Sequence, residues 1–122
     1  MVVLDATNGQ PRWRKRLGGV PISSPAVVRQ GMGLVVIVAG NHGTVHALDF
    51  ADGSVEWEAV LNEATWSSPS VAMTGGVGRV LIGSRLNSLF GLDWRTGARQ
   101  WRVDAGYWID ATAAWYTIGD GD

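Results

Sequence analysis

Short apolar runs separated by turns follow one another along the chain, and none of them has the period of an amphipathic helix. Runs rich in Val, Ile, Leu and Ala alternate with turn sequences such as GNHG at residues 40–43 and DG at residues 52–53. Such runs are typical of β-strands, and hairpin-length turns favour antiparallel meanders over a parallel α/β sheet. The pattern predicts strands at residues 26–29, 34–39, 44–49, 54–61, 70–73, 80–84, 88–93 and 98–104.

A repeat of 44 residues organises these strands. The sequence LDATNGQPRW begins at residue 4, LDFADGSVEW at residue 48 and LDWRTGARQW at residue 92. A second anchor has the same period, because the SSP at residues 23–25 recurs at residues 67–69. Two independent anchors with one period indicate a true internal repeat. A four-stranded antiparallel unit of this length is a β-propeller blade.

The 122 residues span about 2.8 repeats, whereas a closed propeller has four to eight blades. We therefore expect an all-β propeller fragment of four-stranded antiparallel blades. Residues 1–22 would end one blade, 23–66 and 67–110 would form two full blades, and 111–122 would begin the next. A piece of a larger ring, several copies assembled into a ring and an open arc with capped ends all fit this number. The absence of polar capping residues at either end favours the first of these.

Three residue types recur once in every repeat, and each has a structural explanation. The glycine closes a hairpin at a positive φ, and the aspartate four residues earlier is placed to accept N–H groups of the turn. The tryptophan lies on the outermost strand, where a large ring can pack against the neighbouring blade. We predict these architectural roles, rather than catalysis or cofactor stacking, for Asp5, Gly9, Trp13, Asp49, Gly53, Trp57, Asp93, Gly97 and Trp101.

The charge distribution argues against nucleic acid as a partner. Ten Lys and Arg against eleven Asp and Glu leave a formal net charge of −1. The basic run at Arg12, Arg14, Lys15 and Arg16 has no accompanying aromatic stacking pattern, so we interpret it as a solvated strand. The longest apolar run, residues 34–39, is too short for a transmembrane segment. The sequence contains no cysteine, which is compatible with cytoplasm or periplasm.

One face of the predicted propeller carries the candidates for a ligand site. This face combines the turns between second and third strands with the connections between blades, where propellers commonly bind ligands. Its aromatic, amide and charged side chains could hold a small polar ligand or a peptide, with ordinary loop polarity as the alternative. The candidates are Asn41, His42, Arg85 and Asn87 from the turns, and Trp66, Tyr107, Trp108 and Asp110 from the connections.

The sequence predicts neither catalytic residues nor a metal site. His42 and His46 have a spacing that binds zinc on a helix, but they need not converge on a strand and a turn. The Asp-Gly pattern at residues 118–122 is similar to calcium-binding turns of FG-GAP-type propellers. Two aspartates supply fewer oxygen atoms than calcium requires, so we predict no metal there.

The repeat resembles the tryptophan-docking blades of the pyrroloquinoline-quinone-like (PQQ-type) propellers. The resemblance rests on an apolar residue, Asp, a turn ending in Gly and then Trp, and it covers nearly the whole chain. WD40 repeats fit less well because their signature pairs Trp with Asp at the end of a strand, and Kelch repeats are longer with paired glycines.

This resemblance implies two possible functions. The family contains non-catalytic scaffolds, including the propeller lipoprotein of the outer-membrane β-barrel assembly machinery, and quinoprotein alcohol and sugar dehydrogenases. We expect a non-catalytic interaction or assembly scaffold whose partner is another protein or the remaining blades. The alternative is a fragment of a quinoprotein dehydrogenase, which alone would require PQQ and calcium as cofactors. The resemblance also implies a periplasmic or cell-envelope location.

Overall fold

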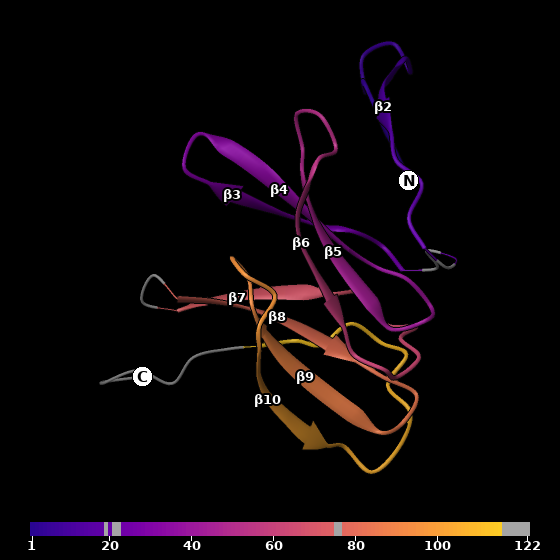
Figure 1. Ribbon diagram of the computed structural model, residues 1–122, viewed down its shortest axis with the longest axis vertical. Helices are drawn as coiled ribbons and strands as arrows, with labels where there is room; N and C mark the ends of the chain where they lie inside the picture. The colour runs from indigo at the N-terminus through magenta and orange to yellow at the C-terminus, as the bar shows by residue number, and fades with distance from the viewer. Residues whose placement is uncertain (19, 21–22, 75–76, 116–122) are drawn as a thin grey trace.

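All regular elements in the described part of the chain are β-strands, as the sequence predicts. The computed structural model describes residues 1–18, 20, 23–74 and 77–115 (Figure 1). Its strands are β1 (Val2–Leu4), β2 (Pro11–Arg14), β3 (Ala26–Gln30), β4 (Gly33–Ala39), β5 (Thr44–Asp49), β6 (Val55–Val60), β7 (Ser70–Thr74), β8 (Val77–Gly83), β9 (Ser88–Asp93) and β10 (Arg99–Asp104).

The strands form a hairpin and two meanders. β3 to β6 pair in sequence order as one four-stranded antiparallel sheet, the first full blade, and β7 to β10 form the second full blade in the same way. β1 and β2 pair as a two-stranded unit, the N-terminal hairpin. β8 begins at Val77, earlier than predicted, because Thr74 still pairs with Val77. The all-β propeller fragment is thus confirmed.

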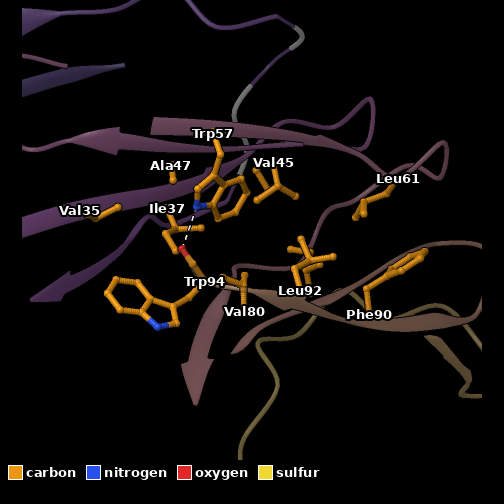
Figure 2. Packing of buried hydrophobic residues seen from close by; sticks show 12 residues of the cluster. Val35, Ile37, Val45, Ala47, Trp57, Leu61, Val80, Phe90, Leu92 and Trp94 are labelled. Atoms are coloured by element: carbon orange, nitrogen blue, oxygen red, sulfur yellow. Dashed lines mark hydrogen bonds between the residues drawn. The ribbon is translucent and has the colours of Figure 1, made fainter. Parts of the chain in front are cut away.

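The main hydrophobic core lies between the two full blades. One face of the first blade contributes Val35, Ile37, Val45 and Ala47, and the facing side of the second blade contributes residues such as Phe90 (Figure 2). Alternate side chains of a strand point to opposite faces, so the remaining apolar residues of the first blade face away from this core.

A second, smaller core lies on the other face of the first full blade. There, Val36, Val38 and Leu48 are buried against residues of the N-terminal hairpin and its flanks, including Trp13. The first full blade is therefore covered on both faces. The second full blade has one face in the main core.

The meander places two kinds of turn at opposite ends of each blade. The β4–β5 and β8–β9 turns lie at the same end as the connections between blades, and we call this end the connection face. The β5–β6 and β9–β10 turns, with their Asp and Gly, lie at the other end (Figure 1). Residues 111–115 contain no strand. The predicted Asp-Gly turn at residues 118–122 lies outside the described residues.

Candidate functional site

Two of the repeated tryptophans, Trp13 and Trp57, each dock on a turn of the next blade. We call each of these contacts a joint. Nε1 of Trp13 donates a hydrogen bond of 2.7 Å to the carbonyl of Phe50. Nε1 of Trp57 donates one of 2.8 Å to the carbonyl of Trp94 (Figure 2). In both joints the acceptor lies 37 residues after the tryptophan. Each joint therefore combines apolar burial with a satisfied indole N–H group.

The repeated glycines make room for these indole rings. Gly53 and Gly97 have positive φ angles of 78° and 76°, which glycine adopts without steric cost. A Cβ atom on Gly53 would overlap with the ring of Trp13, and one on Gly97 with the ring of Trp57. Glycine is thus required at both positions for two reasons. The turn needs a positive φ, and a side chain would collide with the docked indole ring.

The repeated aspartates hold the turns from within. The Oδ1 atom of Asp49 accepts a hydrogen bond of 2.7 Å from the N–H of Ala51, and that of Asp93 accepts one of 2.8 Å from Arg95. Asp5 makes the same contact with Thr7 at 2.8 Å. These carboxylates are engaged with their own backbone, which is the arrangement of an Asx turn.

On the connection face, an arginine lies between two tryptophans. The Arg85 guanidinium carbon is 3.4 Å from the ring centroid of Trp66 and 5.2 Å from that of Trp108. Both distances are within the range of cation–π attraction. Trp66 comes from the connection between the full blades, Arg85 from the β8–β9 turn, and Trp108 from the segment after β10. We call these three residues and Asp110 the Arg85 cluster.

A bidentate ion pair fixes the arginine in this position. Nε of Arg85 donates to Oδ1 of Asp110 at 2.9 Å, and Nη2 donates to Oδ2 at 2.7 Å. These hydrogen bonds hold the pKa of Asp110 below its ordinary value, against a smaller opposing effect of desolvation, and they raise the pKa of Arg85. Two parallel N–H···O bonds orient the guanidinium plane. The cluster therefore presents its aromatic rings on an ordered support.

Beside this cluster, a carboxylate links the blade connection to the second full blade. Glu63 accepts a hydrogen bond of 2.5 Å from the Ser84 hydroxyl and one of 3.1 Å from Nε of Arg102. Burial alone would raise the pKa of Glu63, but hydrogen bonds from Ser84, Ser88 and Arg102 outweigh it, so the pKa is lowered. Sequence reasoning missed Glu63, because its partners lie far away in the sequence.

The other predicted ligand residues have separate positions. Asn41 binds its own chain, since its Oδ1 atom accepts a hydrogen bond of 2.9 Å from the N–H of Val20. Asn87 has a φ of 67° in the β8–β9 turn, and its carbonyl accepts a hydrogen bond of 2.6 Å from Ala105. His42 is exposed in the β4–β5 turn. Tyr107 stacks on Trp108 at 5.8 Å and extends the aromatic surface.

The two histidines do not converge. His46 is buried, and its Nε2 atom lies 2.9 Å from Oε2 of Glu58 on the neighbouring strand. The described residues include no group of three or more His, Asp or Glu side chains that could hold a metal ion. In this part of the chain, no helix has the length and apolarity that a membrane span requires.

A shallow hollow of about 130 Å³ lies at the opposite end from the Arg85 cluster. It is lined by Val77, Gly78, Asp93, Trp94 and Arg95. Ligand pockets typically measure about 300–1,000 Å³, so this hollow is small for a cofactor. The candidate site is therefore the Arg85 cluster, which combines cation–π contacts, an ion pair and exposed aromatic rings.

These features define the chain as part of a β-propeller with four-stranded antiparallel blades. A family model of pyrroloquinoline-quinone-like repeats, PQQ_2, described as outer membrane protein assembly factor BamB, matches residues 1–112. The chain belongs to this family, which confirms the resemblance predicted from the 44-residue repeat.

A solved structure supports the fold independently. The crystal structure of BamB from Moraxella catarrhalis matches with a TM-score of 0.64 and 22% sequence identity. The match covers 78% of this chain and 28% of that one, so this chain spans about a quarter of the length of its structural neighbour. No curated protein matches the chain.

Proposed function

We propose that this chain is a non-catalytic segment of a PQQ-like propeller that acts as an interaction or assembly scaffold. Family membership is consistent with this role, because the matching family model is described as an outer membrane protein assembly factor. By the same reasoning we propose that the chain works in the cell envelope, in the periplasm, with a protein as its partner.

The observation that carries the proposal is the exposed aromatic surface around Arg85. Trp66 is 43% exposed, Trp108 56% and Tyr107 71%. Trp, Tyr and Arg are the residues most enriched among the energetic hot spots of protein interfaces. Exposing large aromatic rings in water is unfavourable, and here an ion pair and cation–π contacts hold them in order. A preordered aromatic surface suits the docking of another protein.

The proposal can be tested by photo-crosslinking in the native cells. A photoreactive phenylalanine analogue would replace Leu86, which is 61% exposed. Leu86 follows Arg85 in the β8–β9 turn and lies on the connection face. The matched control is the same analogue at Met32, which is fully exposed at the opposite end of the first full blade. We expect a product with an outer-membrane assembly protein from position 86 and none from position 32.

A second measurement uses the identified partner in purified form. We expect Trp66→Ala and Trp108→Ala each to weaken binding by about tenfold or more, with Met32→Ala unchanged. Identical products from both crosslinking positions, or full binding by both tryptophan variants, would contradict the proposal. Tight binding of PQQ with calcium by this chain would instead favour the dehydrogenase alternative.

A further inference from the structure

The two full blades hold their connections on the β4–β5 and β8–β9 turns through the same contacts. In the first blade, the N–H of Asn41 donates to the Val20 carbonyl at 3.1 Å. In the second blade, the N–H of Arg85 donates to the Ala64 carbonyl at 2.9 Å. A serine hydroxyl also donates to the last carbonyl of the second strand in each blade, from Ser23 to Ala39 and from Ser67 to Gly83. These shared contacts account for how a blade holds its connection.

The second blade adds a polar network that the first blade lacks. The network consists of Glu63, Ser84 and Arg102, and the positions one repeat earlier hold Gly19, Gly40 and Glu58. Glycine has no side chain that could replace the carboxylate or the hydroxyl group. Because the first blade forms the same four strands without this network, the network is not a requirement of the blade fold. It occurs in the blade whose β8–β9 turn carries Arg85.

The network fixes the orientation of the Ser84 hydroxyl group. Its Oγ atom donates to Oε2 of Glu63 at 2.5 Å and accepts the N–H groups of Leu86 at 3.2 Å and Ser88 at 3.1 Å. Arg102 holds the other carboxylate oxygen, with its Nε and Nη2 atoms at 3.1 Å and 3.0 Å. A hydroxyl group has one proton and two lone pairs, so an acceptor for the proton decides where the lone pairs point. The carboxylate thereby holds the backbone of the β8–β9 turn.

The same carboxylate anchors the connection that carries the aromatic partner of Arg85. Glu63 holds one end of this connection. Ser67 holds the other end, because its hydroxyl donates to the carbonyl of Gly83 at 3.0 Å and accepts the Gly83 N–H at 2.9 Å. Between these anchors Trp66 is exposed, whereas Ser67 is fully buried. Glu63 is therefore connected to both halves of the stack between Arg85 and Trp66.

We propose that Glu63 is a positioning residue for the Arg85 cluster. Through Ser84 it fixes the turn that presents the Arg85 guanidinium, whose carbon atom is 3.4 Å from the ring centroid of Trp66. Groups that are ordered before binding lose less conformational entropy when a partner docks. This ordering serves recognition only where the Arg85 cluster contacts another protein, so the inference rests on the proposed function.

Fluorine NMR of the purified protein, labelled with fluorotryptophan, tests this ordering without any partner. The Trp66 signal is the one that Trp66→Phe removes, and Arg85→Ala gives its position without the cation–π contact. We expect Glu63→Gln to move the Trp66 signal toward its position in Arg85→Ala. Glu56→Gln changes an exposed carboxylate of β6, and this matched control should leave the signal in place.

Ser84→Gly is a second variant, and it introduces the residue type that the first blade has at the equivalent position 40. It should move the Trp66 signal in the same direction as Glu63→Gln. The double variant should move the signal by less than the sum of the two shifts, because the carboxylate acts through the hydroxyl group. Circular dichroism establishes which variants fold. An unmoved signal in either folded variant, or strictly additive shifts, would overturn the inference.

Affinity for the partner identified by crosslinking separates this inference from the proposed function. We expect Glu63→Gln to weaken binding by about threefold or more, less than Trp66→Ala does, with Glu56→Gln unchanged. Unchanged affinity of Glu63→Gln beside weakened binding by Trp66→Ala would overturn the inference and leave the proposed function standing. Full binding by Trp66→Ala would contradict the proposed function, and the fluorine signals would still decide whether Glu63 orders the stack.

Discussion

Equivalent faces of the two full blades differ in what covers them. On the first blade, Val35 and Ala47 face the second blade and are 4% and 0% exposed. One repeat later the same positions hold Arg79 and Gly91, on a face that no further sheet covers among the residues that the structure describes. The backbone of the blade is the same in both cases. The comparison shows that the repeat preserves the strands of a blade. The side chains on a given face, in contrast, depend on what packs against that face.

The second blade covers part of this face with its own residues. The indole of Trp101 lies over Gly91, where a Cβ atom would overlap with it, and Ile109 lies over Gly83 in the same way. In the first blade, the position of Gly83 is Ala39. The glycines at positions 83 and 91 thus leave room for Ile109 and Trp101 to pack directly on the strands. This packing keeps the face dense although no partner sheet lies on it.

The largest expected effect is a difference in stability loss between substitutions of Trp57 and Trp101. Trp57→Ala should lower the free energy of unfolding by about 3–5 kcal/mol, because it empties a buried ring site and leaves the Trp94 carbonyl without its donor. Trp101→Ala should cost less, about 1–2 kcal/mol, since Trp101 is only partly buried and lies on the face away from the main core. Urea denaturation at low protein concentration measures both losses. Equal losses would contradict the distinction between the covered and open faces.

An intermediate effect is expected where Ile109 covers Gly83. Gly83→Ala alone should cost about 1–3 kcal/mol through overpacking against Ile109. Adding Ile109→Thr recreates the pair found in the first blade, Ala39 with Thr65, and should recover part of the loss. The coupling energy from a double-mutant cycle measures this compensation. Strictly additive losses would mean that the two positions are independent.

The smallest expected effect is the contribution of Glu63 to stability and its dependence on pH. Glu63→Gln should cost about 1–2 kcal/mol at neutral pH through weaker hydrogen bonds with Ser84 and Arg102. The folded-state pKa is lowered, so the unfolded chain binds the proton more readily. The stabilisation is therefore present above the ordinary value of 4.5 and disappears as the pH falls through the folded-state pKa.

Thermal unfolding of the unchanged chain and Glu63→Gln between pH 7 and pH 3 measures this effect. The unchanged chain should lose more stability on acidification, so the two curves should converge. Glu56→Gln, at an exposed carboxylate of β6, is the control and should follow the unchanged chain. Parallel curves for the unchanged chain and Glu63→Gln would show that the Glu63 carboxylate contributes nothing in the folded state.

Much of the fold could be predicted because its signals are local. The apolar runs and turns locate the strands, and two anchors with one period identify the blade. Candidate residues of the connection face could also be grouped, since topology decides which loops share an end. Their contacts could not be predicted. Asn41 and Asn87 serve the backbone, whereas Arg85 joins Trp66, because those outcomes depend on distances between segments far apart in the sequence.

The amino-acid pattern alone was sufficient for the 44-residue blade, its hairpin turns and the positions of the repeated Asp, Gly and Trp. These features depend on backbone conformation and on residues close in the sequence. Only the tertiary structure decided which tryptophans are docked, that Arg85 pairs with Asp110, and that Glu63 links a connection to the second blade. Such contacts arise when distant segments meet across a sheet or between blades, and their geometry is set by packing rather than by sequence spacing.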